Sequence, residues 1–424
     1  MMKPTVVAIL TVAQLYLSAT SAFALTLKDC LTRAAVANSQ LKASSHDEQV
    51  ATEAVGIATS GYLPRVDLQA GYTAQQAPQA VKFTAEPIPT QQADYAFANL
   101  SIYQTLYDFG RTRARREQAI MASEAAQQAY RGEEQDVFLQ VVRAYYGILA
   151  GQKYLVTADD EVKQMTHHRK VAQDMYEQGV VTRNDLLQAQ VKLANSKQKR
   201  LSAANSLENS WLYLNFLTGQ ETGFRSELEE PEQRTETADL HMMMEIALRK
   251  RPEIAALKKT ILADEAAIRE YRSNYYPELY AKLAMDYLEN NRVQEQTILS
   301  ATVGFKINLF DGLATTSRKR QAVKIRSREE ERLRNLEASV RLELETALND
   351  LKVAEERILV SETAIRQSEE NLRINNDRYV EKVGTATDVI DAQTLLTQTR
   401  NDYFSSIFDY QVAAARVKRA VGEL

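Results

Sequence analysis

The sequence predicts an internally duplicated chain that combines long coiled-coil helices with two pairs of amphipathic β-strands. These strands would complete a membrane β-barrel together with strands from other copies. Three observations lead to this fold class. Glycine and proline are scarce, with 14 and 8 residues among 424, less than half of their usual share. The two halves repeat one order of motifs, and each half contains two segments of alternating apolar and polar residues.

Long helices are possible because proline is absent from residues 90–230 and 278–424, and proline breaks helix interiors. In the second stretch apolar residues recur every seven positions, which predicts a coiled-coil seam: Leu344, Leu351, Ile358, Ile365, Leu372 and Tyr379. The first half has the corresponding set Val141, Ile148, Leu155, Val162, Arg169 and Tyr176. A helix over residues 113–178 would be about 100 Å long, too long for one globular core.

The duplication is visible in the residues that punctuate the chain. An offset of 213 matches Tyr62 and Pro64 with Tyr275 and Pro277, and an offset of 203 matches Thr182 and Asp185 with Thr385 and Asp388. The offset changes between Pro64 and Tyr107, which predicts a longer loop in the first half. The chain therefore divides into a first repeat (25–219), a short acidic linker (220–238) and a second repeat (239–424).

Each repeat is expected to contain a helix, two strands, a long helix and a shorter helix. The shorter helices of the first repeat, 27–60 and 182–217, together match the length of its long helix. Two short helices stacked end to end could therefore lie along one long helix. The second repeat offers the same arrangement with 240–273 and 385–421.

The four candidate strands each alternate over about ten residues, with one apolar and one polar face. The apolar face would contain Leu68, Leu100, Leu283, Val303 and Phe305, and the polar face Gln69, Ser101, Lys282 and Lys306. A soluble sheet packed on a helix explains this alternation equally well. Aromatic residues at the strand ends and an export signal favour a barrel. Four strands cannot close a barrel, and an open edge in lipid leaves backbone groups unpaired, so several chains must contribute.

The export signal is the first 24 residues. Lys3 provides a positive start, an apolar stretch follows, and Ala22-Phe23-Ala24 forms a cleavage site of small residues. This pattern is typical of a secretory signal peptide. The alternative, a membrane anchor, is disfavoured because the apolar stretch is shorter than the roughly 20 residues that span a bilayer.

The motifs taken in order resemble the TolC family of outer-membrane efflux proteins over the whole mature chain. They are Leu25-Thr26-Leu27, Tyr62-Leu63-Pro64, Tyr176-Glu177-Gln178-Gly179, Leu309-Phe310-Asp311-Gly312 and Val383-Gly384-Thr385. The resemblance implies a homotrimer that shares a twelve-stranded barrel in the outer membrane, above a helical coiled-coil tunnel in the periplasm. It also implies docking to a periplasmic adaptor (membrane fusion) protein and an inner-membrane pump or ABC transporter. Such proteins export drugs, metals or secreted proteins.

Two alternatives stay open at this point. Multidrug efflux and type I secretion are not separated by these motifs. A soluble periplasmic coiled-coil scaffold or adaptor is the rival function, although adaptors usually carry one helical hairpin rather than two.

The candidate functional residues lie at the two turns that join long and short helices. The resemblance implies that these tips contact the adaptor, at Gly179, Val180, Val181, Thr182, Val383, Gly384 and Thr385. It also implies an acidic aperture formed by Asp388 and Asp391, with Asp185 as a further possible contact. Asp388 is equally well placed to cap its helix together with Thr385, as Asp185 is with Thr182. Ala386 and Glu381 stand where some members carry an arginine and a tyrosine, so the closing contacts must differ.

Catalytic chemistry and cofactors are not expected. No nucleophile elbow or phosphate loop is present, and the single cysteine, Cys30, excludes a cysteine-based zinc site. His167 and His168 are adjacent on a helix, about 100° apart, and are interpreted as ordinary polar positions rather than metal ligands. Charges of both signs are mixed along the chain, which argues against a nucleic-acid partner.

Overall fold

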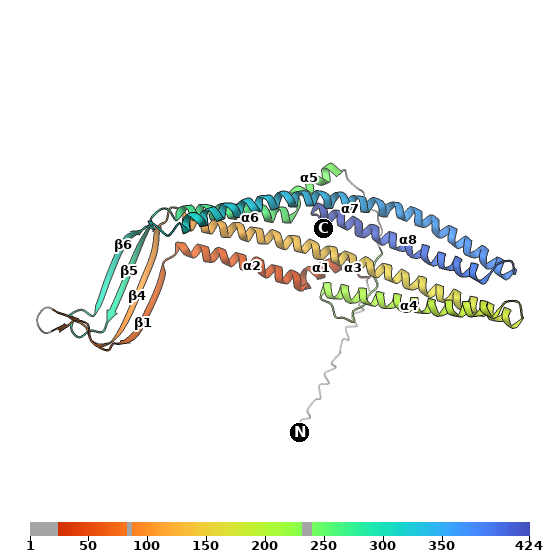
Figure 1. Cartoon of the computed structure of the whole chain (residues 1–424), viewed down its shortest axis with the longest axis horizontal. Helices are drawn as coiled ribbons and strands as arrows, with labels where there is room; N and C mark the ends of the chain where they lie inside the picture. Colours follow the sequence, from red (N-terminus) through yellow and green to blue (C-terminus); the bar gives the residue numbers. More distant parts are fainter. Residues whose placement is uncertain (1–23, 83–86, 231–239) are drawn as a thin grey trace, which may run out of the picture.

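A computed structural model describes residues 24–82, 87–230 and 240–424. Figure 1 shows an elongated molecule with a sheet at one end, a bend, and long helices that end in two tips at the far end. The predicted signal peptide lies outside the described residues except for Ala24, and so does the end of the predicted linker from residue 231 onward.

The two halves have the same element order. Each half begins with two helices in series. In the first half these are α1 (Leu27–Ala37) and α2 (Ser39–Thr59), and in the second half they are α5 (Leu240–Lys250) and α6 (Pro252–Ser273). The main strands are β1 (Arg65–Ala74), β4 (Asp94–Tyr107), β5 (Glu278–Leu288) and β6 (Thr297–Lys306). Each half ends in a helical hairpin, α3 (Arg111–Glu177) with α4 (Arg183–Thr218), and α7 (Ala314–Val380) with α8 (Ala386–Val421). A short turn (Ser60–Tyr62) precedes β1, and a small hairpin, β2 (Ala80–Val81) and β3 (Ile88–Pro89), occupies the longer first-half loop.

The end-to-end stacking of short helices is confirmed in both halves. The helices α1, α2 and α4 pack along α3, and α5, α6 and α8 pack along α7. The two halves also form one wall, because α6 lies against α3 as well as α7, and α8 contacts α3 too. Among the described helices, none combines the length and the apolar character needed to cross a membrane.

The sequence predicted one continuous first helix in each half. This prediction is wrong, because the structure divides each of these helices into two. Asn38 has an extended backbone (ψ 125°), and its side chain accepts hydrogen bonds from the N–H groups of Gln40 and Leu41 to start α2. The matching residue in the second half is Arg251, which precedes the proline that begins α6. Asn38 donates to the Leu217 carbonyl at 3.0 Å, and Arg251 donates to the Ala420 carbonyl at 3.4 Å.

These two contacts occupy matching positions in the repeat. Asn38 and Arg251 are related by the offset of 213, and Leu217 and Ala420 by the offset of 203. The two breaks therefore form the same joint in the two halves. Each side chain satisfies a carbonyl at the end of the shorter hairpin helix, where backbone acceptors have no partner within the helix. The breaks therefore fasten the two end-to-end helices of each half to one another.

The coiled-coil seam predicted from the seven-residue repeat is the core of the second hairpin. Leu344, Leu351, Ile358 and Tyr379 are buried, and the small residues Ala347 and Ala354 that lie between them are buried too. Small side chains let the helices approach closely, and the apolar burial stabilises the hairpin. A second core joins α1, α3 and α4 and includes Phe408 of α8, so the two hairpins share buried surface.

The four long strands form one antiparallel sheet in the order β1-β4-β5-β6. The strand pairing aligns Leu68 with Leu100, and Ile102 with Leu283. Paired residues share a face of a sheet, so the predicted apolar set lies on one face and the predicted polar set on the other. The apolar face is open in the single chain, and Val303 is 72% exposed.

We expect Gly219→Ala to lower the melting temperature of the purified protein more than Gly179→Ala. Both glycines have a left-handed backbone, with φ of 65° and 73°, which costs other residues about 1–2 kcal/mol. A methyl group at Gly219 would also lie 2.6 Å from the Cβ of Ala37, whereas nothing lies within 4 Å at Gly179. Equal shifts in the two variants would contradict the packing of α1 against the end of α4.

Candidate functional site at the helical tips

Both tips close their long helix with the same backbone pattern. At the first tip Val180 N–H donates to the Met175 carbonyl at 2.8 Å, and at the second Val383 N–H donates to the Arg378 carbonyl at 2.9 Å. The left-handed residue of this motif is Gly179 in the first tip. In the second tip it is Lys382, and the backbone of Gly384 is not left-handed. Figure 1 shows that the two tips lie at the same end of the molecule.

The shorter hairpin helices, α4 and α8, both start with the capping box that the sequence allowed. Thr385 N–H donates to Asp388 Oδ2 at 2.9 Å, and Thr182 N–H donates to Asp185 Oδ2 at the same distance. The backbone and side chain of Thr385 hold the pKa of Asp388 below its usual range. Asp388 is therefore a negatively charged cap at the start of α8, where the helix dipole also favours it.

Asp391 takes no part in the cap and is exposed on the next turn of α8. Its charge acts on Lys192 of the neighbouring hairpin, whose pKa is lowered mainly by burial and raised again in part by Glu161 and Asp391. The Lys192 ammonium donates to Thr394 Oγ1 at 2.6 Å, which ties α4 to α8 just above the tips. Sequence reasoning missed this cation, because the repeat places an apolar residue, Leu395, at the matching position.

A buried carboxylate lies in the same region. Glu161 of α3 is 1% exposed, accepts a hydrogen bond from Ser196 Oγ at 2.9 Å, and lies 3.6 Å from Lys199 Nζ and 4.0 Å from Lys192 Nζ. A buried charge is tolerated only when it is paired. Glu161 therefore fixes α4 against α3, and through Lys192 it is linked to α8.

A cavity of about 270 Å³ separates the two hairpins above the tips, between α3, α7 and α8. His168 and Tyr379 both line it, and their rings contact each other with centres 5.2 Å apart. His168 is buried, so its interpretation as an ordinary polar position is wrong. Burial, with a smaller effect of His167, lowers its pKa and keeps the ring neutral. In the described residues no group of three or more histidine, cysteine and carboxylate side chains could hold a metal ion.

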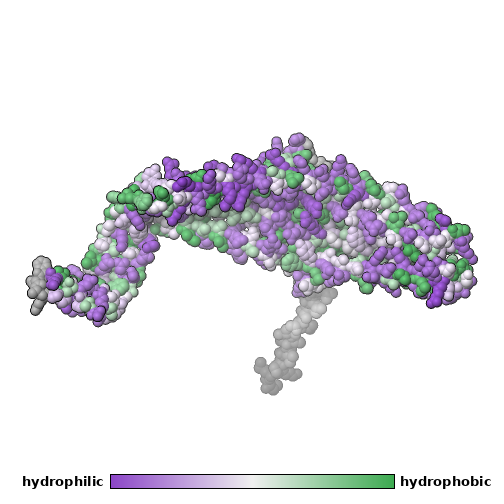
Figure 2. All heavy atoms as spheres, viewed as in Figure 1, coloured by the Kyte–Doolittle hydropathy of each residue, from purple (hydrophilic) through white to green (hydrophobic). Residues whose placement is uncertain are grey.

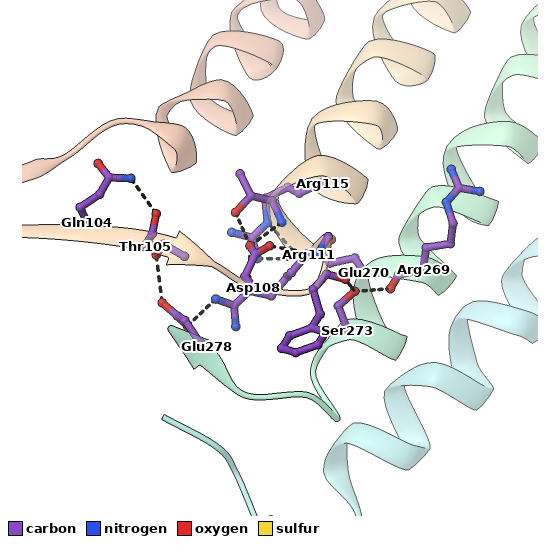
Figure 3. A network of polar contacts seen from close by, with 12 residues as sticks. Gln104, Thr105, Asp108, Arg111, Arg115, Arg269, Glu270, Ser273 and Glu278 are labelled. Atoms are coloured by element: carbon purple, nitrogen blue, oxygen red, sulfur yellow. Dashed lines mark hydrogen bonds and ion pairs between the residues drawn. The ribbon is translucent and has the colours of Figure 1, made fainter. Parts of the chain in front are cut away.

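At the opposite end, a polar network fixes the bend between sheet and helices (Figure 3). Glu278 at the start of β5 pairs with Arg111 of α3 and accepts hydrogen bonds from Tyr103 and Thr105, both at 2.9 Å. Asp108 caps α3 through the Thr112 N–H at 2.7 Å. The end of β4 thus leads into α3, and the start of α3 is held to the neighbouring strand β5 by the pair of Arg111 with Glu278.

This fold defines a class of chain in which a small sheet is joined to two long helical hairpins whose tips lie at one end. The sequence matches the Outer membrane efflux protein family over residues 30–220 and 243–423, and the chain belongs to that family. Its members are non-enzymatic channels of the Gram-negative outer membrane with a helical tunnel in the periplasm.

Relatives and solved structures agree with this assignment. The chain is 24% identical to the outer membrane protein TolC of Vibrio cholerae, over 91% of this chain and 88% of that protein. It is also 24% identical to the alkaline protease secretion protein AprF of Pseudomonas aeruginosa, over 78% and 70%. The fold resembles the outer-membrane channel OprN with a TM-score of 0.81 at 17% identity, covering 94% of this chain and 90% of that one. For the Campylobacter jejuni CmeC channel the TM-score is 0.83 at 15% identity, covering 94% and 85%.

Proposed function

We propose that three copies of this chain form a passive exit duct through the outer membrane. Each copy would add four strands to one twelve-stranded barrel and its hairpins to a tunnel in the periplasm. The observation that carries this proposal is the sheet itself. Its outer strands, β1 and β6, each pair on one side only in the described chain, and one of its faces is apolar and exposed. Lipid would cover that face, and neighbouring copies would pair the edges.

The cargo is a drug, a metal ion or a secreted protein. Both export routes have support, since the family is described as outer membrane efflux proteins and the relative AprF is named for alkaline protease secretion. Efflux and type I secretion therefore stay as alternatives within the same duct. The soluble scaffold or adaptor is not carried further, because the chain belongs to an outer-membrane family.

The helical tips are proposed as the docking surface for a periplasmic adaptor, which would in turn contact an inner-membrane pump or ABC transporter. Val180 and Val383 are exposed apolar residues at the extreme end of the molecule. The residues expected to take part are Gly179, Val180, Val181, Thr182, Val383, Gly384 and Thr385. Exposed valines on rigid turns offer a preformed apolar contact for a partner.

Asp388 and Asp391 are proposed as the residues that control ion passage at the narrow end. Threefold symmetry would give two rings of three carboxylates, which favour cations over anions. Asp391 is the stronger candidate because its carboxylate is not used for capping. Lys192 would partly offset its charge, so the selectivity is tuned by both hairpins. Asp185 stays a possible further contact.

We expect Val303→Arg to reduce the yield of trimers in the outer membrane far more than Thr302→Arg. The two residues are adjacent on β6 and lie on opposite faces. A charge on the lipid face costs up to about 2–4 kcal/mol near mid-membrane, whereas changes in the lumen are mild. Equal assembly of the two variants, measured after detergent extraction of outer membranes, would reverse the assignment of the faces.

The docking proposal is tested by placing a photo-crosslinking amino acid at Val383 in living cells. We expect a covalent product with a periplasmic adaptor, identified by mass spectrometry. Val383 is preferred to Gly384, because a side chain at Gly384 would come within 3.3 Å of the backbone of Arg378 and Tyr379. The control is the same probe at Val50, exposed on α2 far from the tips. Products with copies of this chain only would contradict docking at the tips.

The aperture proposal is tested in planar bilayers. We expect the purified channel to be cation-selective and to be blocked by trivalent cations added from the periplasmic side. Asp388→Ala combined with Asp391→Ala should remove the block and reduce selectivity, and Asp391→Ala alone should account for most of the change. An unchanged block in the double variant would move the selectivity site elsewhere and leave Asp388 as a helix cap.

A further inference from the structure

The bend between sheet and helices carries a set of exposed apolar side chains. Leu309 and Phe310, which follow β6, are 88% and 79% exposed, and Leu313 just before α7 is also exposed. Figure 2 shows hydrophobic residues gathered at this bend, directly beside a hydrophilic stretch over the nearby helices. The apolar set continues the open face of the sheet, where Val303 and Phe305 are exposed as well.

Basic residues follow within the first turns of α7. Arg318, Arg320 and Lys324 are exposed, and in the described part of the chain none of them forms an ion pair. Arg320 and Lys324 are four residues apart and share one side of the helix, whereas Arg318 lies about 160° around the helix from Arg320. Here we call Arg320 and Lys324 the basic cluster. Arg318 acts only at longer range on Asp311, whose carboxylate caps α7 through the Thr315 N–H at 2.9 Å.

Two other basic residues near the bend pair with carboxylates of α6. Arg326 pairs with Glu265 at 3.2 Å, and on α3 Arg115 pairs with Glu270 at 2.6 Å. Lys319 lies 5.9 Å from the centre of the Tyr275 ring. The carboxylates of Glu265 and Glu270 are thus used by other cations, and within the described chain the basic cluster has no carboxylate partner.

The spacing of the cluster fits a membrane surface. Residues 320 and 324 lie about 9 and 15 Å along the helix from its first residue. The headgroup layer on one side of a bilayer is about 5–8 Å thick, and long basic side chains extend several ångströms toward it. With Leu309 and Phe310 at the edge of the hydrocarbon, the cations would reach the level of the lipid phosphates.

We propose that the basic cluster binds the phosphate groups of anionic phospholipids in the periplasmic leaflet of the outer membrane. This inference rests on the proposed barrel, since it needs the apolar face of the sheet to lie in lipid. A lipid explains both features together, because its acyl chains cover the apolar residues while its headgroup meets the unpaired cations. A free phosphate ion would satisfy the cations only and leave the apolar residues in water.

Native mass spectrometry of the intact, detergent-purified protein tests this directly. Phosphatidylglycerol and phosphatidylcholine with identical acyl chains are titrated in parallel. We expect the wild-type protein to retain more phosphatidylglycerol, and the double variant Arg320→Gln, Lys324→Gln to lose that preference by about tenfold or more. The control is Lys352→Gln, Arg357→Gln, which removes the same charge from exposed positions farther along α7. It should keep the preference.

Three results would overturn the proposal: no preference in the wild-type protein, an equal loss in the control variant, or displacement of the lipid by inorganic phosphate at similar concentration. The last result would define a site for free anions. Failure of the barrel itself is recognised separately, because the wild-type protein would then be absent from the outer-membrane fraction.

Discussion

The fold is governed by a sheet that is incomplete in a single chain. Four strands leave two edges, β1 and β6, that pair on one side only, and every unpaired backbone group in lipid costs several kcal/mol. The sheet also exposes an apolar face that water does not favour. The proposed closure with other copies inside a membrane would solve both problems. The helices would follow the same symmetry, because three residues join β4 to α3 and seven join β6 to α7.

The helical part solves a different problem, that of length. A long helix such as α3 has no single partner of its own length, so two shorter helices cover it in series. The joint between them needs a polar contact to satisfy the exposed helix end. Asn38 and Arg251 make that contact at equivalent carbonyls in the two halves, although an amide and a guanidinium are chemically different. Duplication has thus kept the geometry of the joint while changing its chemistry.

Much of this architecture could be predicted from periodicity. The seven-residue repeat identified Leu344 and Leu351 as seam residues, and alternation separated the two faces of the sheet. These patterns are local, and burial of apolar surface enforces them over long distances. The breaks at Asn38 and Arg251 were not predicted, since only Pro252 gave a signal and none was present at Asn38. A left-handed Lys382 was also missed, because glycine is the usual residue there.

The candidate site was less accessible to sequence reasoning. The capping boxes of Thr182 and Thr385 were readable because they depend on a fixed spacing of three residues. The burial of Glu161, its partner Lys192 and the contact of His168 with Tyr379 join residues from different helices. Charged and imidazole side chains on long helices are normally solvated, and only the packing of two hairpins against each other places these inside.

The central claim is that the sheet is completed by other copies of the chain. The most direct test is the mass of the protein extracted from the outer membrane in mild detergent, measured by native mass spectrometry. Three chains in one complex is the result that the account requires. A single chain, whether released without detergent or stable within it, would leave the strand edges without partners and would contradict the account.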